Sequence, residues 1–166
     1  MSYREGNFKD IEGLKNLALR SWTQFQSELT DENWHKLRTF LTDDTTFIDL
    51  LEKSFCLVCE HETQEIIGMS FLVPSGNPTE IYDKSWAYIR MVTVDQKFAG
   101  QGIGRKLTEK CIHYASKKGE TTIALHTSEM MPAARYLYES LGFKILKEIE
   151  SRLGKKYWLY TRSLVN

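Results

Sequence analysis

The stretch AYIRMVTVDQKFAGQGIGRKLTEKCIHYASKKGETTIALHT (residues 87–127) decides the fold of this chain. Residues 87–94 and 122–127 have the apolar, β-branched composition of strands. Between them, Ile103, Leu107 and Cys111 recur at helical spacing, and Gly119 ends the segment as a helix C-cap. A strand, a glycine loop, a helix and a second strand form a βαβ unit. We therefore expect two parallel strands joined by a right-handed crossover.

Three glycines, at positions 100, 102 and 104, stand just before this helix. Glycine lets the backbone bend tightly and approach a ligand closely. The unpaired N–H groups of the first helical turn then favour an anion, by about 0.3–1 kcal/mol for each dipole contact at a surface. A pyrophosphate is the expected ligand. The loop is not a P-loop, because no Lys-Ser or Lys-Thr follows it, and Arg105 occupies the last glycine position of a dinucleotide fingerprint.

The rest of the sequence predicts further helices and strands around this unit. Helices are expected after Asp10, after Thr30 or Asp31, and after Asp43 or Asp44, each with an apolar stripe. A short strand is expected at 3–7, and strands at 55–60 and 65–73 should form a hairpin through the turn HETQ, ahead of a proline- and glycine-containing loop. The order of these elements predicts an α/β fold with a mixed sheet.

Composition limits the classes of protein to which the chain belongs. Its 166 residues fit one domain, expected over residues 1–166. Lys plus Arg and Asp plus Glu are both 22, and a net charge of zero argues against a nucleic-acid or membrane-surface partner. The N-terminus is polar, and the longest apolar stretch is too short to span a bilayer. We therefore expect a cytoplasmic protein with neither a nucleic-acid nor a membrane partner.

The cysteines and histidines do not have the spacing of metal ligands. Cys56 and Cys59 lie three residues apart on an expected strand, so their side chains point to opposite faces and favour buried thiols. A reducing compartment is the default for such thiols. The four histidines show no ligand spacing, and we expect no metal.

The zero net charge conceals an asymmetry. Residues 1–66 hold 7 basic and 13 acidic residues, a net of −6, and residues 67–166 hold 15 basic and 9 acidic residues, a net of +6. The basic part contains the glycine loop. We expect the acidic part to produce a negative field that attracts a cation.

A second motif, SEMMPAARYLYESLGF (128–143), follows the βαβ unit. With the glycine loop it resembles the GNAT superfamily of N-acetyltransferases, whose loop is [QR]-x-x-G-x-[GA] and whose later helix is N-x-x-A-x-x-x-Y-x-x-x-G-F. Gly102 and Gly104 match the first pattern, and Ala99 stands in place of its Gln or Arg. The second pattern is matched by Ala134, Tyr138, Gly142 and Phe143, with Met131 in place of its Asn. The two departures remove two side-chain contacts to the cofactor.

The resemblance implies a mixed sheet flanked by helices, with the two strands of the βαβ unit splayed apart to hold the pantetheine arm of acetyl-CoA. It also implies an acetyl-CoA-dependent N-acetyltransferase in which Tyr138 is the general acid. The cofactor-binding positions that it implies are Val92, Val94, Gly100, Gln101, Gly102, Ile103, Gly104 and Arg105.

The general base and the acceptor stay open. Many relatives place a Glu six residues before the Val94 position, where this chain has Tyr88; His126 and Glu129 are further candidates as base or acceptor-site residues. Trp22 lies in the connection expected to close over a small-molecule or peptide amine, whereas Trp34 is expected in the core. A homodimer is left open. The alternative function is a non-catalytic acyl-CoA-binding sensor, which the two motif departures and the missing Glu favour.

Overall fold

The computed structural model describes residues 1–165 and contains one mixed sheet of seven strands in the order β1-β2-β3-β4-β5-β7-β6. The strands are β1 (Ser2–Glu5), β2 (Phe55–Glu60), β3 (Ile66–Val73), β4 (Ala87–Val94), β5 (Thr122–Ser128), β6 (Lys144–Arg152) and β7 (Lys155–Ser163). The α-helices are α1 (Ile11–Trp22), α2 (Asp31–Thr42), α3 (Asp44–Lys53), α4 (Ile103–Lys117) and α5 (Pro132–Ser140). None of the helices in the described part of the chain is long and apolar enough to cross a membrane.

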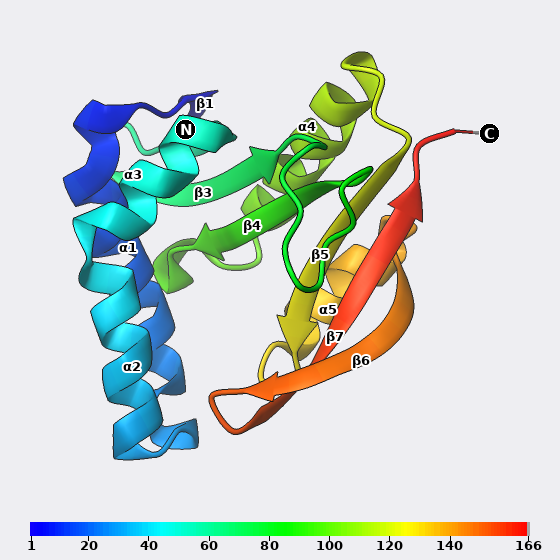
Figure 1. Cartoon of the computed structure of the whole chain (residues 1–166). Coiled ribbons are helices and arrows are strands. Elements are labelled where there is room, and N and C mark those ends of the chain that lie inside the picture. Colours follow the sequence, from blue (N-terminus) through cyan, green and yellow to red (C-terminus); the bar gives the residue numbers. More distant parts are fainter. Residues whose placement is uncertain (166) are drawn as a thin grey trace.

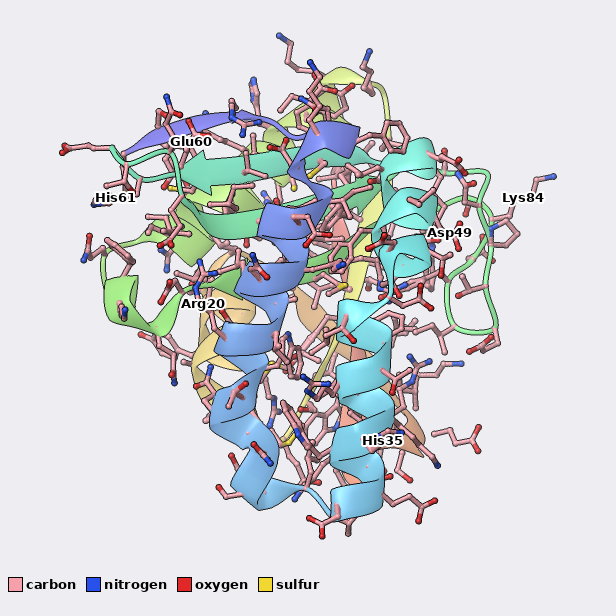
Figure 2. The ribbon with its side chains drawn as sticks, turned by 90° about the vertical axis from the view of Figure 1, so that its left-hand side faces the viewer. Arg20, His35, Asp49, Glu60, His61 and Lys84 are labelled. Atoms are coloured by element: carbon pink, nitrogen blue, oxygen red, sulfur yellow. The ribbon has the colours of Figure 1, made fainter. Side chains whose placement is uncertain are left out.

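The helices form a layer on each face of the sheet (Figure 1). Helices α1, α2 and α3 lie together on one face, in front of the strands in Figure 2. Their apolar stripes meet the sheet in a core that includes Leu14, Phe47 and Phe71, all fully buried. Helices α4 and α5 cover the opposite face, where Leu107 and Cys111 of α4 are also fully buried.

Most of the predicted elements are confirmed. β4 and β5 are parallel, β2 and β3 form the expected hairpin, and Thr30 and Asp43 cap α2 and α3. Asp10 is the N-cap residue of α1 as predicted, but its carboxylate accepts hydrogen bonds from the Arg4 guanidinium at 2.8 and 3.0 Å and none from the first turn of the helix. Arg4 holds the pKa of that carboxyl below its usual range.

Cys56 and Cys59 are buried free thiols on opposite faces of β2, as the sequence predicts. Cys56 belongs to the core beneath α1, and Cys59 to the core beneath α4. The pair therefore serves packing.

The two strands of the βαβ unit separate soon after they begin. β4 and β5 share only two pairs, Ala87 with Ile123 and Tyr88 with Ala124, and beyond these their arrowheads point in different directions in Figure 1. Met91 has a φ of +54°, and the β3–β4 register shifts at the same level of the sheet. A bulge of this kind bends a strand and increases its local twist. The expected splay of the two strands is thus present.

A long C-terminal hairpin, β6–β7, completes the sheet, and the sequence analysis made no prediction for it. β7 pairs with β5 from Thr122 to Ser128 and so occupies the side of β5 that faces away from β4. The hairpin turns at Leu153 and Gly154, with φ values of +56° and +72°. Two consecutive positive φ values are the geometry of a type I′ turn. This turn brings Arg152 to the end of the hairpin, beside the open end of β4 and β5.

Candidate active site

The glycine loop forms an open cradle at the N-terminus of α4. Gly100 and Gly102 both have a φ of +80°, and Gly102 is the N-cap of the helix. Among the described residues, none accepts a hydrogen bond from the backbone amides of residues 100–105. A Cβ placed on either glycine would meet no atom within 4 Å, so the space in front of the loop is open. The loop can therefore present several N–H groups and a helix dipole to a diphosphate.

Basic side chains border this cradle as predicted. Arg105 and Lys106 are exposed, and the Arg105 guanidinium donates to the Ser140 hydroxyl at 2.8 Å. This bond ties the start of α4 to the end of α5. Ala99 contributes no polar side chain, so the loop relies on its amides and on these two cations.

A pocket of about 350 Å³ occupies the gap between β4 and β5. Its walls come from both strands, from α1 and α2 on one face, from α5 on the other, and from the β6–β7 turn. Val92 of β4, Met131 at the N-cap of α5 and Ala134 of α5 line it. This is the position where the sequence resemblance predicts the pantetheine arm and the thioester.

Tyr138 of α5 lines the same pocket and is 6% exposed. Its ring packs edge-on against Phe143, with 6.0 Å between the centroids. Burial raises the pKa of its phenol above the ordinary value, so the hydroxyl stays protonated at neutral pH. Thr127 of β5 is also in this wall, and its buried hydroxyl has no hydrogen-bond partner among the described residues. The pocket thus contains a proton donor and an unpaired hydroxyl.

His126 lies in the pocket but is a poor base. Its Nδ1 lies 2.5 Å from the Tyr82 hydroxyl and its Nε2 lies 3.4 Å from Nη1 of Arg152. Because a guanidinium only donates, Nε2 is the acceptor and the ring proton is on Nδ1. Burial, followed by the charges of Arg90 and Arg152, lowers the pKa of His126 to about 3. The ring is therefore neutral, and it binds a proton far too weakly to deprotonate an amine.

The other two base candidates lie outside the pocket. Tyr88 is fully buried, its hydroxyl donates to the carbonyl of Asn77 at 3.0 Å, and its ring stacks on Tyr82 at 4.0 Å. Glu129 is exposed, and its carboxylate accepts a hydrogen bond from the amide of Lys156 at 2.6 Å. Both interpretations as catalytic residues are corrected: each side chain holds a loop or turn in place.

The acceptor side of the pocket is aromatic, as expected. Its charge differs from the negative charge that the sequence predicts. Trp22 lines it, and Phe25 packs on Trp22 at 5.4 Å, whereas Trp34 packs against the N-terminal core. The predicted negative field is absent from this wall, because the one charged residue that α1 and α2 contribute to it is Lys36. The acidic residues of the N-terminal part lie elsewhere on the surface.

Five functional candidates of this pocket or its border were not predicted from the sequence: Lys36, Tyr82, Arg90, Arg152 and Tyr157. Tyr82 comes from the loop before β4 and reaches His126, while Arg152 and Tyr157 flank the hairpin turn. The dipeptide Leu153-Gly154 between two runs of strand-forming residues was an available signal for the hairpin. Nothing in the sequence indicates which residue of a loop contacts a strand.

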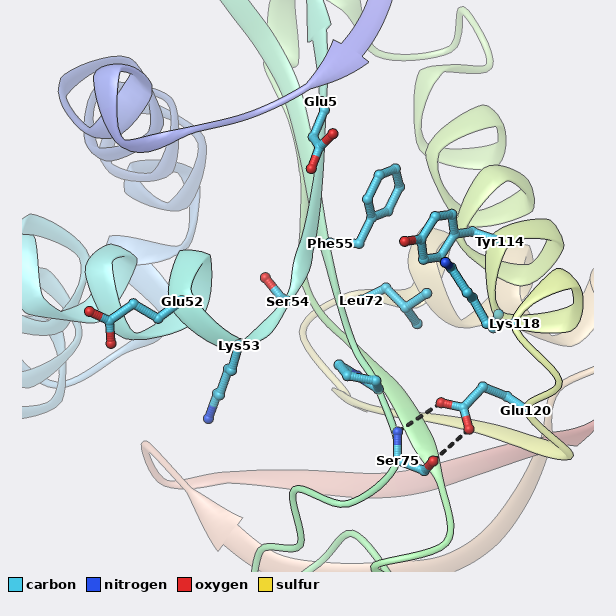
Figure 3. Close-up of a pocket in the computed structure, with 12 residues that line it drawn as sticks. Glu5, Glu52, Lys53, Ser54, Phe55, Leu72, Ser75, Tyr114, Lys118 and Glu120 are labelled. Carbon is cyan, nitrogen blue, oxygen red and sulfur yellow. Dashed lines mark hydrogen bonds between the residues drawn. The ribbon is translucent and has the colours of Figure 1, made fainter.

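A second pocket, of about 550 Å³, lies at the other end of the sheet (Figure 3). It is bordered by the start of β2, the end of β3 and the C-terminal end of α4. Phe55 and Tyr114 stack at 4.0 Å in its wall. None of the predicted site residues lies in it.

Comparison with known proteins agrees with the geometry of the open end. The family model described as the acetyltransferase (GNAT) family matches residues 12–143. The chain belongs to this family. Among curated proteins, human N-acetyltransferase 8B is 29% identical over 128 residues, which are 77% of this chain and 52% of that protein. Zebrafish (Danio rerio) N-acetylaspartate synthetase is 35% identical over 68 residues, or 41% of this chain and 24% of that protein.

Solved structures share the fold of this GNAT chain. The PaiA N-acetyltransferase of Thermoplasma acidophilum, crystallised with coenzyme A, superposes with a TM-score of 0.77 at 16% identity and covers 98% of this chain and 99% of its own. The ribosomal-protein-S18-alanine N-acetyltransferase of Escherichia coli has a TM-score of 0.74 at 17% identity, over 99% and 94% of the two chains. The chain spans about half the length of human N-acetyltransferases 8B and 8.

Proposed function

We propose that this GNAT chain transfers the acetyl group of acetyl-CoA to a primary amine by direct attack on the thioester. The observation that carries the proposal is that the glycine cradle follows β4 in the chain, at the end where β4 and β5 separate. A diphosphate on the amides of residues 100–105 would direct the pantetheine arm along the unpaired edge of β4, past Val92 and Val94. The thioester would then reach the pocket beside Tyr138.

The chemistry requires a neutral amine and a protonated leaving group. The amine nitrogen attacks the carbonyl carbon, the carbon–sulfur bond breaks, and the nitrogen loses a proton. A lysine-like amine has a pKa near 10.4, so losing that proton at pH 7 costs roughly 4–5 kcal/mol. No carboxylate lines the pocket within the described residues, and His126 is too weakly basic. The proton therefore leaves to water, and desolvation of the amine in the aromatic pocket lowers its pKa.

Tyr138 supplies the leaving group with a hydrogen bond that becomes a proton transfer late in the reaction. A thiol has a reference pKa near 8.5, well below that of a phenol, so transfer to the thiolate is uphill by at least about 2 kcal/mol. Burial of Tyr138 increases this cost and also keeps the phenol protonated throughout the neutral range. Solvent returns the proton to Tyr138 after coenzyme A leaves.

The acceptor is a small-molecule or peptide amine. The names of similar proteins cover both kinds: one is an N-acetylaspartate synthetase and another is a ribosomal-protein-S18-alanine N-acetyltransferase. The three buried free cysteines favour a reducing, cytoplasmic location for the reaction. The edge strand β6, with Ile145 and Leu146 about half exposed, favours a second copy of the chain as its partner.

The test is release of the coenzyme A thiol from acetyl-CoA with a panel of amines, together with calorimetric titration of acetyl-CoA. We expect binding and amine-dependent thiol release. Binding without turnover on any amine would instead identify an acyl-CoA sensor.

Replacing Tyr138 tests the acid role directly. We expect Tyr138→Phe to lower kcat about tenfold, or about 1.4 kcal/mol in the barrier, with an unchanged Kd for acetyl-CoA. Tyr114→Phe removes a hydroxyl from the pocket at the other end of the sheet and should leave kcat unchanged. Normal turnover by Tyr138→Phe would remove this residue from the acid role.

A further inference from the structure

Three cations and no carboxylate line the acceptor side of the pocket in the described chain. Arg90 comes from β4, Arg152 from the end of β6, and Lys36 from α2. These elements are far apart in the sequence and meet only in the folded chain. The hairpin turn lies against α2, since a Cβ on Gly154 would stand 3.3 Å from Nδ2 of Asn33. The cationic wall is therefore formed by packing that holds the hairpin against the helix.

Arg90 is a partly buried cation without a partner. Its guanidinium makes neither a hydrogen bond nor an ion pair with any described residue, although Asp49 lines an adjoining smaller cavity with it. Arg152 is only weakly paired: the carboxylate of Glu80 is 3.6 Å away on a side chain that is 84% exposed. A partly buried cation has lost part of its hydration, and an anion that binds beside it stabilises it.

Both arginines line the pocket together with the same side chain, His126. Arg152 is 3.4 Å from its Nε2, and the charges of Arg90 and Arg152 both act on the ring. Side chains alternate between the faces of a strand. His126 therefore points away from the face of β5 that carries Thr127 and meets α5. The two arginines thus act on the acceptor side of the gap, opposite the thioester and the phosphates of acetyl-CoA.

We propose that the acceptor is a small primary amine that also carries a carboxylate, as an amino acid does, and that Arg90 and Arg152 bind this carboxylate. The inference rests on the proposed function, since it assigns the second substrate of the same site. A guanidinium presents two parallel N–H groups that match a carboxylate, and such bonds fix orientation as well as adding affinity. The bound carboxylate would hold the amine of the same molecule at the gap, facing the thioester.

The proposal excludes acceptors that are cations alone. A diamine or a lysine side chain would bring its positive charge against two guanidiniums and Lys36. Like charges in a partly buried site repel. The neutral His126 ring fits this assignment, because its Nδ1–H is directed at Tyr82 and it adds no charge to the wall.

The experiment compares amino acids with their own α-amides as acceptors, in thiol-release assays of the full chain. The amide removes the carboxylate and lowers the amine pKa, so more of it is neutral at pH 7.5 and its intrinsic reactivity is higher. A preference for the acid therefore has to come from the pocket. We expect kcat/KM for the preferred acid to exceed that of its amide at least 30-fold.

Arg90→Gln and Arg152→Gln should each reduce that ratio at least tenfold, mainly through KM for the acid, while the Kd for acetyl-CoA stays unchanged. Arg38→Gln is the matched control, because Arg38 is an exposed arginine of α2 that does not line the pocket. It should leave the ratio intact. Equal or better turnover of the amides, or an unchanged ratio in both variants, would overturn the inference and leave the acetyltransferase proposal standing.

Direct binding separates the two proposals. Titration of the amino acids into the protein–coenzyme A complex measures the arginine site without any turnover. Binding that Arg90→Gln abolishes, combined with no turnover of any amine, would sustain the carboxylate site at the arginines and reject the acetyltransferase, and with it the role of the bound amino acid as acceptor. Absence of binding by every amino acid that is tested would overturn the inference.

Discussion

The two ends of β4 and β5 differ in whether the strands pair with each other. The difference shows what distinguishes a ligand-binding site from a surface pocket without a function. At the amino end, Ala87 and Tyr88 pair with β5, and Tyr82 stacks over Tyr88. At the carboxyl end the strands separate, and the gap holds Tyr138 and the free hydroxyl of Thr127. Main-chain groups of β4 and β5 satisfy one another at the first end. At the second end they are free for a ligand.

The larger pocket is at the closed end, and several of its polar groups already have partners within it. Glu120 accepts hydrogen bonds from the amide and the hydroxyl of Ser75, at 2.7 and 2.6 Å (Figure 3). Lys118 lies over the ring of Tyr114, 5.4 Å from its centroid. Side chains of both charges line it. Volume alone therefore does not identify the site; a group of cations without a carboxylate, beside an open strand edge, does.

The largest expected effect comes from filling each pocket in turn. Ala134→Trp would project an indole into the gap and should weaken acetyl-CoA binding at least about 100-fold, or roughly 2.7 kcal/mol. Lys118→Trp adds the same ring to the pocket at the closed end and should leave the Kd unchanged. Calorimetric titration, with melting temperatures to check folding, measures both. Equal losses in the two variants would remove the functional distinction between the ends.

A smaller loss is expected at the glycine loop. Gly102→Ala forces a Cβ onto a φ of +80° and should weaken acetyl-CoA binding about 30-fold, or roughly 2 kcal/mol, because the relaxed backbone turns its amides from the diphosphate. Gly119→Ala is the matched control. Gly119 lies at the far end of α4, has a φ of +85° and likewise has open space where a Cβ would stand. This control variant should lower the free energy of unfolding by a similar amount, measured by urea unfolding, and should leave the Kd for acetyl-CoA unchanged. An unchanged Kd in Gly102→Ala would mean that the diphosphate binds elsewhere.

The smallest effect concerns the pH dependence of stability at the open end. The pKa of His126 falls from 6.5 to about 3 on folding, so below pH 6.5 the unfolded chain binds a proton that the folded chain does not. The free energy of unfolding should therefore decrease as the pH falls, by about 1.4 kcal/mol between pH 7.5 and 5.5 from this group. Urea unfolding at the two pH values measures the loss. His126→Gln should abolish this component, and a variant with the wild-type pH dependence would refute the assignment.

The cofactor half of the site could be predicted from the sequence because its information is local. Glycines at fixed spacing, a helix that begins behind them, and the run from Ala134 to Phe143 all lie within one βαβ–α segment. Backbone amides at a helix N-terminus bind an anion whatever surrounds them. Tyr138 was found from its match to the helix pattern of the GNAT superfamily, which lies within the same segment.

The acceptor half could not be predicted, because separate elements form it. Arg90, Arg152 and Lys36 come from a strand, a hairpin turn and a helix, and the sequence spacing between them says nothing of their distance in space. The same holds for the failed base candidates. Tyr88 has the expected position on β4, but the loop of residues 74–86 covers it and takes its hydroxyl. Whether a strand residue faces a substrate depends on what else packs against that face.

The sequence by itself determined the parallel βαβ unit, the anion-binding loop and the tyrosine of α5, because periodicity and glycine conformation act over a few residues. The tertiary structure alone decided that the acceptor wall is positive. The acidic residues of the first 66 positions lie mainly on exposed helix faces and turns, while the hairpin brings an arginine from the other end of the chain. Net charge along a sequence therefore did not give the charge of the pocket, since a pocket is lined by the few side chains that folding brings to it.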